Sequence, residues 1–327
     1  MTLNVTNWNA EPPHAIASLG ECMIEVTTGD DGRLQQHYGG DTLNTAVYLA
    51  RLLPRPITTV DYVTVLGDDP FSRAMLDEWS REGLGIGLVR VLKGRLPGLY
   101  WIVTNEQGER SFYYWRREAP ARSLVSGQNK QNLTERLAAY QLVYLSGITL
   151  AILSNRDRAR LLHVLEEIRS RGVRIVFDTN FRLNLWRTVK QAREWIDAVS
   201  NLVDVAVVSF DDQRAMFTDA APVDTCARLA SHGIGEIVVK NGAGPCTISA
   251  DGHTASVATS SLIEVADTTA AGDSFNAAYI AARLSGVGVE EAARAGHNLA
   301  QKVIGYHGAI LPAQETPNLV ALMAADE

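Results

Sequence analysis

The sequence contains few cysteines and no stretch typical of a membrane span or an export signal. Cys22, Cys226 and Cys246 are far apart in 327 residues and form no CxxC pair, which argues against a disulfide framework or a zinc ribbon. The N-terminus has no basic region followed by an apolar stretch, and no window approaches the roughly 20 apolar residues that cross a bilayer. We therefore expect a cytoplasmic protein that makes no contact with a membrane.

Positively charged residues are also fewer than negatively charged ones. Lysine and arginine together number 30 against 37 aspartates and glutamates, so the net charge is −7. An acidic chain disfavours non-specific attraction to nucleic acid, and we expect no nucleic-acid partner. An anionic ligand must then be bound by local charges.

The hydrophobic share of 46% is that of an ordinary globular protein, and the length permits one large domain.

Several catalytic motifs are missing as well. There is no GxxxxGK[ST] loop and no GxGxxG after the first strand, so neither a P-loop enzyme nor a dinucleotide oxidoreductase is indicated. HExxH and GxSxG motifs are absent, and the seven histidines are scattered. The chemistry must be sought in other combinations of residues.

What the sequence does contain is an alternation of apolar runs and amphipathic stretches, which is typical of βαβ units around a mostly parallel sheet. Residues 16–26 are expected to form a strand and residues 34–38 a returning strand. A helix follows Gly39-Gly40 and is expected to be capped by Asp41 or Thr42. Further strands are expected at residues 59–66, 142–145, 174–177, 205–208 and 237–239.

One segment departs from this alternation. Residues 99–104 and 109–116 predict an antiparallel hairpin. Its aromatic side chains lie on both faces, with Tyr100, Ile102, Tyr114 and Arg116 on one and Trp101, Tyr113 and Trp115 on the other. A hairpin that is apolar on both sides needs cover on both, by a ligand cleft or core on one side and a second subunit on the other. We therefore expect a homo-oligomer.

The strongest candidate for chemistry is the segment 267–275. Small residues at Ala270, Ala271 and Gly272 precede a helix that begins near Asp273. The free N–H groups and the dipole at the start of that helix form an anion site, and Asp273 in the first turn can accept a proton from a hydroxyl. The alternative is a capped helix packed closely on a sheet.

Two weaker candidates complete the pattern. Residues 240–244 form a glycine-containing turn after a strand, at the sheet edge where a nucleotide could lie. Gly39-Gly40 clears space before a helix, where Asp41 and Asn44 could bind hydroxyl groups. The alternative for this second pair is an ordinary helix start.

Together these segments resemble the ribokinase-like (PfkB) carbohydrate kinases over roughly residues 15 to 315. Within this family they are most similar to the kinases of 2-keto-3-deoxygluconate. The similarity rests on six blocks in one order: GECMIE at 20–25, GGDTLN at 39–44, LPGLY at 96–100, FYYWR at 112–116, LSGI at 145–148 and DTTAAGD at 267–273.

The resemblance implies a fold and a reaction. The fold is a single domain over residues 1–327, a three-layer α/β/α sandwich with a mostly parallel central sheet and a small β-sheet lid from about 22–40 and 96–118. The reaction is transfer of a phosphoryl group from ATP, with Mg²⁺, to 2-keto-3-deoxy-D-gluconate. A kinase of 2-keto-3-deoxygalactonate, fructose or ribose remains an alternative, as does a non-catalytic sugar-acid sensor.

The resemblance also implies roles for single residues. Asp273 is the base, and the amides of Ala270, Ala271 and Gly272 form the anion hole. The sugar acid is held by Gly40, Asp41, Asn44, Tyr100, Tyr114, Arg116 and Arg182. The nucleotide lies along Asn180, Lys240, Gly242, Ala243, Gly244 and Asn298. A carboxylate in the substrate suits the guanidinium groups of Arg116 and Arg182, whereas a neutral sugar would not need them.

The chain departs from the family pattern in two places. Alanine stands at position 270 where the family has glycine, and this is tolerated if φ is negative there. Ser209 and Asp212 replace the family's Asn-x-x-Glu, which is associated with Mg²⁺ and phosphate. Related proteins also bind a monovalent cation such as K⁺ near the Asp267 loop, and the sequence leaves open whether this chain needs one.

Overall fold

The computed structural model describes residue 8 and residues 14–29, 32–104, 110–127, 130–259 and 265–324. The strands of these ranges are β1 (His14–Leu19), β2 (Met23–Thr28), β3 (Leu34–Gly39), β4 (Thr58–Val63), β5 (Val65–Gly67), β6 (Arg90–Leu92), β7 (Gly98–Thr104), β8 (Arg110–Trp115), β9 (Leu142–Ser146), β10 (Arg174–Asp178), β11 (Val205–Ser209), β12 (Glu236–Asn241), β13 (Gly244–Ala250) and β14 (His253–Val257).

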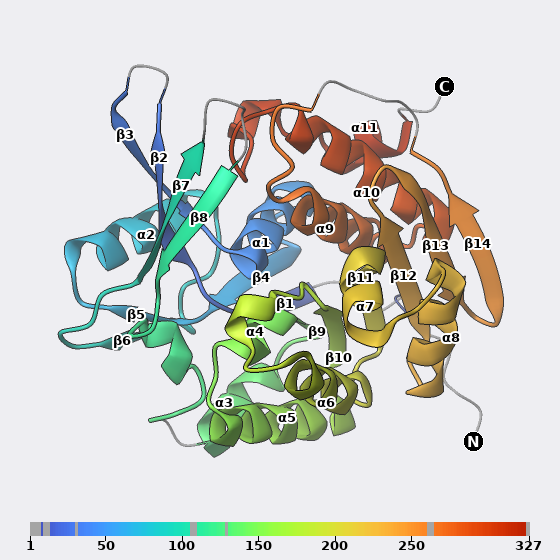
Figure 1. The fold of residues 1–327 in the computed structure, drawn as a ribbon, viewed down its shortest axis with the longest axis horizontal. Coiled ribbons are helices and arrows are strands. Elements are labelled where there is room, and N and C mark those ends of the chain that lie inside the picture. Colours follow the sequence, from blue (N-terminus) through green and yellow to red (C-terminus); the bar gives the residue numbers. More distant parts are fainter. Residues whose placement is uncertain are drawn as a thin grey trace.

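The helices alternate with these strands (Figure 1). They are α1 (Asp41–Leu52), α2 (Pro70–Arg81), α3 (Lys130–Leu137), α4 (Gly147–Ala151), α5 (Asn155–Ser170), α6 (Val189–Ser200), α7 (Phe210–Phe217), α8 (Pro222–Ser231), α9 (Ala271–Leu284), α10 (Val289–Ile304) and α11 (Leu319–Ala324). Short 3₁₀ turns lie at Pro120–Ser123, Leu183–Leu185 and Ala313–Glu315. Within the described ranges, no helix combines the length and the apolar character needed to cross a membrane.

The central sheet has the strand order β14-β13-β12-β11-β10-β9-β1-β4. Neighbouring strands from β12 to β4 pair in parallel, whereas β13 and β14 add an antiparallel edge that the sequence pattern did not predict. The chain runs from β1 outward to β4 and then returns to β9 on the other side of β1. Ligands of such sheets bind beyond the carboxyl ends of the strands at this change of direction.

Helices cover both faces of the central sheet (Figure 1). Alternate residues of one strand enter different cores: Leu142 and Tyr144 of β9 pack in the core with α1, α9 and α10, whereas Val143 packs in the core with α5 and α6. This alternation is the period-two pattern of a strand buried on both sides. The expected three-layer α/β/α architecture is confirmed.

A second, smaller sheet has the order β3-β2-β7-β8 and stands beside the central sheet (Figure 1). The predicted hairpin is confirmed by the antiparallel register of β7 and β8, in which Tyr100 lies opposite Tyr114. Residues 105–109 of its connection, and residues 30–31 between β2 and β3, lie outside the described residues. We call these four strands the lid sheet.

Some sequence expectations were wrong in detail. Residues 16–26 are not one strand: β1 belongs to the central sheet and β2 to the lid sheet, because the apolar run continues through the point where the pairing partner changes. The cap of α1 is Gly40, and Asp41 is the first helical residue. The expected strand at 59–66 is divided between β4 and β5. The turn after Lys240 joins the antiparallel strands β12 and β13.

Candidate active site

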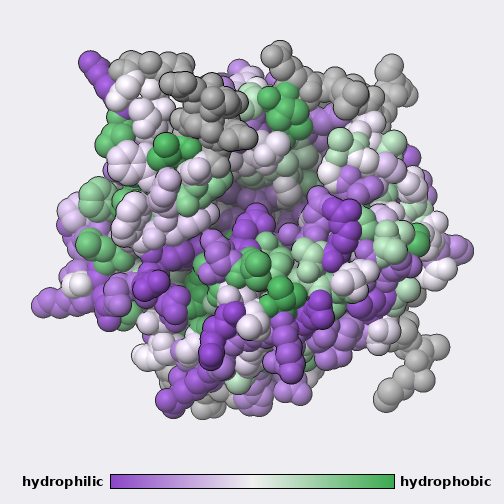
Figure 2. Space-filling model, in the orientation of Figure 1, coloured by the Kyte–Doolittle hydropathy of each residue, from purple (hydrophilic) through white to green (hydrophobic). Residues whose placement is uncertain are grey.

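Polar residues at the carboxyl ends of parallel strands line one cavity. Glu21 follows β1, and Asp178, Ser209 and Lys240 stand at the ends of β10, β11 and β12. The cavity has a volume of about 790 Å³, which is in the range of small-molecule sites. Figure 2 shows this face hollowed between the lid sheet and the α9 side, with hydrophilic residues deep in the hollow.

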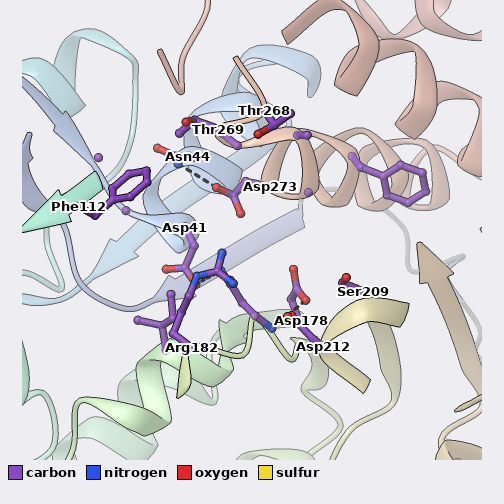
Figure 3. A pocket seen from close by; sticks show the side chains of 18 of the residues that line it. Asp41, Asn44, Phe112, Asp178, Arg182, Ser209, Asp212, Thr268, Thr269 and Asp273 are labelled. Atoms are coloured by element: carbon purple, nitrogen blue, oxygen red, sulfur yellow. Dashed lines mark hydrogen bonds between the residues drawn. The ribbon is translucent and has the colours of Figure 1, made fainter. Parts of the chain in front are cut away.

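Asp273 lies in the first turn of α9 and faces the cavity (Figure 3). Its Oδ2 accepts a hydrogen bond of 2.9 Å from Asn44 Nδ2. Burial raises the pKa of Asp273 to about 7, and the carboxylates of Asp41 and Asp178 contribute in the same direction. Asn44 and Lys240 act against this rise. A carboxyl group with a pKa near neutrality can take up and release a proton under physiological conditions.

The start of α9 is open to an anion. In the described part of the chain no side chain caps the helix, so its first N–H groups lack the side-chain acceptor that most helices provide. The Ala271 N–H makes a long bond of 3.3 Å to the carbonyl of Thr268. Thr268, Thr269 and residues 270–272 all line the cavity. A negatively charged group is favoured here by the helix dipole.

Ala270 has φ 60° and ψ 12°, which is the left-handed conformation. The condition under which a methyl group is tolerated without strain, a negative φ, is therefore not met. The loop must turn sharply between Asp267 and α9, and a methyl group does not prevent this. Alanine is strained in this region and glycine is not, so glycine would adopt this conformation at lower cost.

This strain predicts that Ala270→Gly stabilises the protein. The left-handed conformation costs alanine about 1–2 kcal/mol, partly offset by the larger freedom of glycine in the unfolded chain, so we expect a gain of about 0.5–1 kcal/mol. Urea unfolding measures it. The matched control is Ala271→Gly, at the first helical residue, which should lower stability because glycine is a poor helix former. Equal effects of the two substitutions would contradict the assignment of strain to residue 270.

Asp41 and Asn180 meet across the cavity. Asn180 Nδ2 donates to Asp41 Oδ2 at 2.8 Å, although 139 positions separate them. Burial raises the pKa of Asp41 above its usual range. Gly40 precedes Asp41 where the chain passes Glu21, and a Cβ on Gly40 would lie 2.1 Å from the Glu21 carbonyl oxygen. Asn180, expected along the nucleotide, thus touches a residue expected at the sugar.

The two arginines expected at the sugar acid differ in environment. Arg116 is 8% exposed and forms an ion pair with Glu21, which is 2% exposed. Its guanidinium also lies 5.9 Å from the centre of the Tyr114 ring, next to Tyr100. Arg182 is exposed and donates to the carbonyl of Phe181, and it has no ion-pair partner among the described residues. Arg182 is near enough to Asp212 to lower the pKa of that carboxyl, but unlike Arg116 it is not held in an ion pair within the described ranges.

Asp212 and Ser209 also line the cavity. Burial raises the pKa of Asp212 to about 6, and Asp178 nearby contributes to this rise. Its Oδ2 accepts from the Phe181 N–H at 2.9 Å. No cluster of three metal-ligating side chains occurs in the described residues. A half-buried carboxylate of this kind fits a divalent ion that arrives with phosphate groups as its other ligands.

The structure brings most of the expected residues into this cavity. They are Gly40, Asp41, Asn44, Tyr100, Tyr114, Arg116, Asn180, Arg182, Lys240, Gly242, Ala270, Ala271, Gly272 and Asp273. Ala243 and Gly244 lie in the same turn as Gly242 but do not line it. Asn298 lies on α10 and donates to the carbonyl of Leu322 at 2.8 Å, away from the lining.

Sequence reasoning missed several residues of the site. Glu21 and Asp178 were not singled out for a role in binding, although Asp178 directly follows a predicted strand and strand ends are where such sites form. Asn276 and Tyr144 were also missed, because their contacts depend on the packing of α9 against β9. Of these residues, only Asp178 could have been identified from the sequence, because it directly follows a predicted strand.

Known proteins resemble this chain over most of its length. The profile of the pfkB family carbohydrate kinases matches residues 13–317. The chain is 43% identical over 306 residues to 2-dehydro-3-deoxygluconokinase of Escherichia coli strain K12, and 40% identical to that of Dickeya dadantii strain 3937. Each alignment covers 92% of this chain and 98% of the relative.

Solved structures show the same fold at low identity. The 2-dehydro-3-deoxygluconokinase of Thermotoga maritima superposes with a TM-score of 0.81 at 18% identity, covering 96% of this chain and 99% of that one. A putative ribokinase II of Escherichia coli in complex with ATP and Mg²⁺ gives 0.77 at 19% identity, covering 94% and 97%.

Proposed function

The chain belongs to the pfkB family of carbohydrate kinases, and from this membership we propose that it transfers the γ-phosphoryl group of ATP to the 6-hydroxyl of 2-keto-3-deoxy-D-gluconate. Relatives at 40–43% identity carry the name of the kinase for this compound, written as 2-dehydro-3-deoxygluconate. The observation that carries the proposal is a buried carboxyl group, Asp273, in the first turn of an uncapped helix that opens into the same cavity as Arg182.

In the proposed reaction Asp273 acts as the base. Its carboxylate takes the proton of the 6-hydroxyl while the hydroxyl oxygen forms a bond to the γ-phosphorus. The bond from that phosphorus to the oxygen bridging to the β-phosphate breaks, and ADP leaves with the electron pair. The amides of Ala270, Ala271 and Gly272 form the anion hole that stabilises charge on the phosphoryl oxygens. The uncapped start of α9 supports this assignment.

We further propose how the cavity is divided. Gly40, Asp41, Asn44, Tyr100, Tyr114, Arg116 and Arg182 hold the sugar acid. The nucleotide lies toward Asn180, Lys240, the turn at residues 242–244 and Asn298. Mg²⁺ accompanies ATP and neutralises charge on its phosphates, and Asp212 with Ser209 would hold it. We also propose that a monovalent cation such as K⁺ binds near the Asp267 loop.

A coupled assay of ADP release tests the proposal. The purified protein is given Mg·ATP with 2-keto-3-deoxygluconate, its galactonate epimer, gluconate, fructose or ribose. We expect the highest kcat/KM for 2-keto-3-deoxygluconate. Preference for fructose or ribose would keep the kinase but reject the sugar acid. Tight calorimetric binding of the acid without ADP release would instead favour a sensor.

The charge of Arg182 predicts a specific loss of affinity. Arg182→Gln should raise KM for the sugar acid about 10- to 100-fold, since hydrogen bonds to a charged group contribute more than neutral ones. KM for ATP and the weak activity on neutral sugars should not change. Arg187→Gln, an exposed arginine five positions along the chain, is the control. An equal rise of KM for acid and neutral sugars would reject a role in binding the carboxylate.

The raised pKa of Asp273 predicts an acidic limit to activity. A base works only when ionised, so kcat/KM should fall tenfold per pH unit below about 7, the pKa of Asp273, and level off above it. Steady-state kinetics from pH 5 to 9 in buffers of constant ionic strength measure the profile. The residual activity of Asp273→Asn should lack this inflection. A profile that stays flat down to pH 5 would contradict the assignment.

We also propose that the chain forms one domain whose lid sheet makes contact between subunits. Tyr113 and Trp115 are 53% and 60% exposed on the lid sheet and, unlike Phe112 and Tyr114, do not line the cavity. Exposed aromatic patches of this kind favour a partner surface. Light scattering after size-exclusion chromatography tests this subunit contact, with Trp115→Glu expected to shift the mass to that of a monomer.

The need for ATP supports the cytoplasmic location expected from the sequence.

A further inference from the structure

Lys240 is held in place by side chains to which the proposed reaction assigns no role. Its Nζ donates to Asn276 Oδ1 at 2.7 Å and lies 3.1 Å from Asp178 Oδ2. The three residues come from different elements, β12, α9 and β10. The Lys240 side chain is only 13% exposed although it borders the cavity. A lysine on a surface would keep its side-chain freedom, and this one has lost it.

The partners of Lys240 are themselves fixed. Asn276 Nδ2 donates to Asp178 Oδ2 at 2.7 Å and to the Tyr144 hydroxyl at 3.0 Å. Asp178 Oδ1 accepts the backbone N–H of Asn180 at 3.2 Å. Turning the Asn276 amide over would point its NH₂ at the ammonium and its oxygen at the Asp178 carboxylate, and both of those bonds would be lost. The network therefore allows one position for the ammonium group.

That position is at the start of α9. A Cβ built on Gly272 would lie 3.3 Å from Lys240 Nζ, so the ammonium sits beside the first turn of the helix. An ammonium group has three N–H donors, and Asp178 and Asn276 take two of them. The third remains for a ligand in the cavity, which Lys240, Gly242 and Gly272 all line. The positive charge and the uncapped helix start act on the same space.

The charge on a phosphoryl group in transfer spreads over its outer oxygens, and donors fixed in advance stabilise it. This inference rests on the proposed function. We propose that Lys240 is a catalytic residue that contacts the transferring phosphoryl group, and that Asp178 and Asn276 are positioning residues that direct its ammonium toward the start of α9. Asp178 thus positions Lys240. Both carboxylate oxygens of Asp178 already accept hydrogen bonds from donors of the protein.

Kinetics of Lys240→Met, Asn276→Ala and the double variant test the proposal. Lys240→Met should lower kcat about 100-fold, as loss of one preorganised donor does, while KM for the sugar acid stays unchanged. Lys240→Arg keeps the charge and should recover part of kcat. Asn276→Ala should lower kcat about tenfold in the wild-type background and not at all beside Lys240→Met, because its effect passes through the lysine. Lys302→Met, on the outer side of α10, is the control.

A second readout separates catalysis from folding. Lys240 holds down the pKa of Asp273, so Lys240→Met should move the acidic limb of the pH profile to higher pH, which a loss of folded protein would not do. Thermal unfolding of each variant checks that it is folded, and Lys240→Gln replaces Lys240→Met if that variant is not.

The outcomes are distinct. An unchanged kcat in Lys240→Met, or a rise of KM for ATP alone, would overturn the catalytic role of the lysine. Additive losses in the double variant would overturn the positioning role of Asn276. A wild-type protein that releases no ADP with any sugar would overturn the proposed function itself, and the lysine assignment with it. A wild-type kinase with a fully active Lys240→Met variant would overturn only the lysine assignment.

Discussion

Replacing Asp273 by asparagine is expected to lower kcat about 10³-fold, because general base catalysis contributes about 10²- to 10⁴-fold and the amide cannot take up the proton. The substitution keeps the size of the side chain, and Asn44 can still approach its oxygen. KM for the sugar acid should remain close to that of the wild type, since the residues that hold the sugar are unchanged. Stopped-time assays of ADP release, with kcat and KM fitted separately, measure both.

The control for this substitution is Asp61→Asn. Asp61 is a half-buried aspartate of β4 whose pKa is also raised by burial, but it lies outside the cavity lining. Its replacement makes the same chemical change at another partly shielded aspartate and should leave kcat unchanged. Full activity of Asp273→Asn would reject Asp273 as the base, and an equal loss in both variants would indicate damage to the fold rather than to the chemistry.

The repeating parts of the fold could be predicted from the sequence because their signals are local. Asp69 caps α2 and Pro70 is its first residue, an order of residues typical of a helix start, and Asp69 Oδ1 accepts from the N–H groups of Phe71 and Ser72. Asp273 was likewise expected in the first turn of a helix and lies there. Such signals depend on residues within four positions of each other, which a sequence displays directly.

The pairings inside the site could not be predicted in the same way. Asp41 meets Asn180, and Glu21 meets Arg116, across 139 and 95 positions of chain. The parallel topology decides which strand ends become neighbours, and no local pattern encodes the side-chain partner. The conformation of Ala270 is a further case. Alanine disfavours a positive φ, so only the folded loop shows that the surrounding structure imposes a positive φ on this residue.

The amino ends of the same strands present a contrasting group of buried charges. Glu236 begins β12 and is 1% exposed. Its two oxygens accept from Arg283 at 2.9 and 3.1 Å, from the Tyr279 hydroxyl at 2.7 Å and from Trp8 Nε1 at 2.8 Å. The guanidinium groups of Arg174 and Arg283 lie 4.6 and 5.4 Å from the Trp8 ring centre. This group joins residue 8 to β12 and α9, at the end of the sheet opposite the cavity.

Glu236→Ala is therefore expected to reduce stability strongly and catalysis not at all. Removing one partner of a buried ion pair costs about 3–5 kcal/mol, because Arg283 is left uncompensated and two further donors lose their acceptor. Urea unfolding should show this loss, whereas kcat and KM of the folded variant at low temperature should equal those of the wild type. The matched control is Glu135→Ala, which removes an exposed ion pair with Arg171 and should cost at most about 1 kcal/mol. If Glu236→Ala lowered kcat without lowering stability, the amino ends of the strands would be coupled to the active site. It would then be wrong to assign stability to the amino ends of the strands and catalysis to their carboxyl ends.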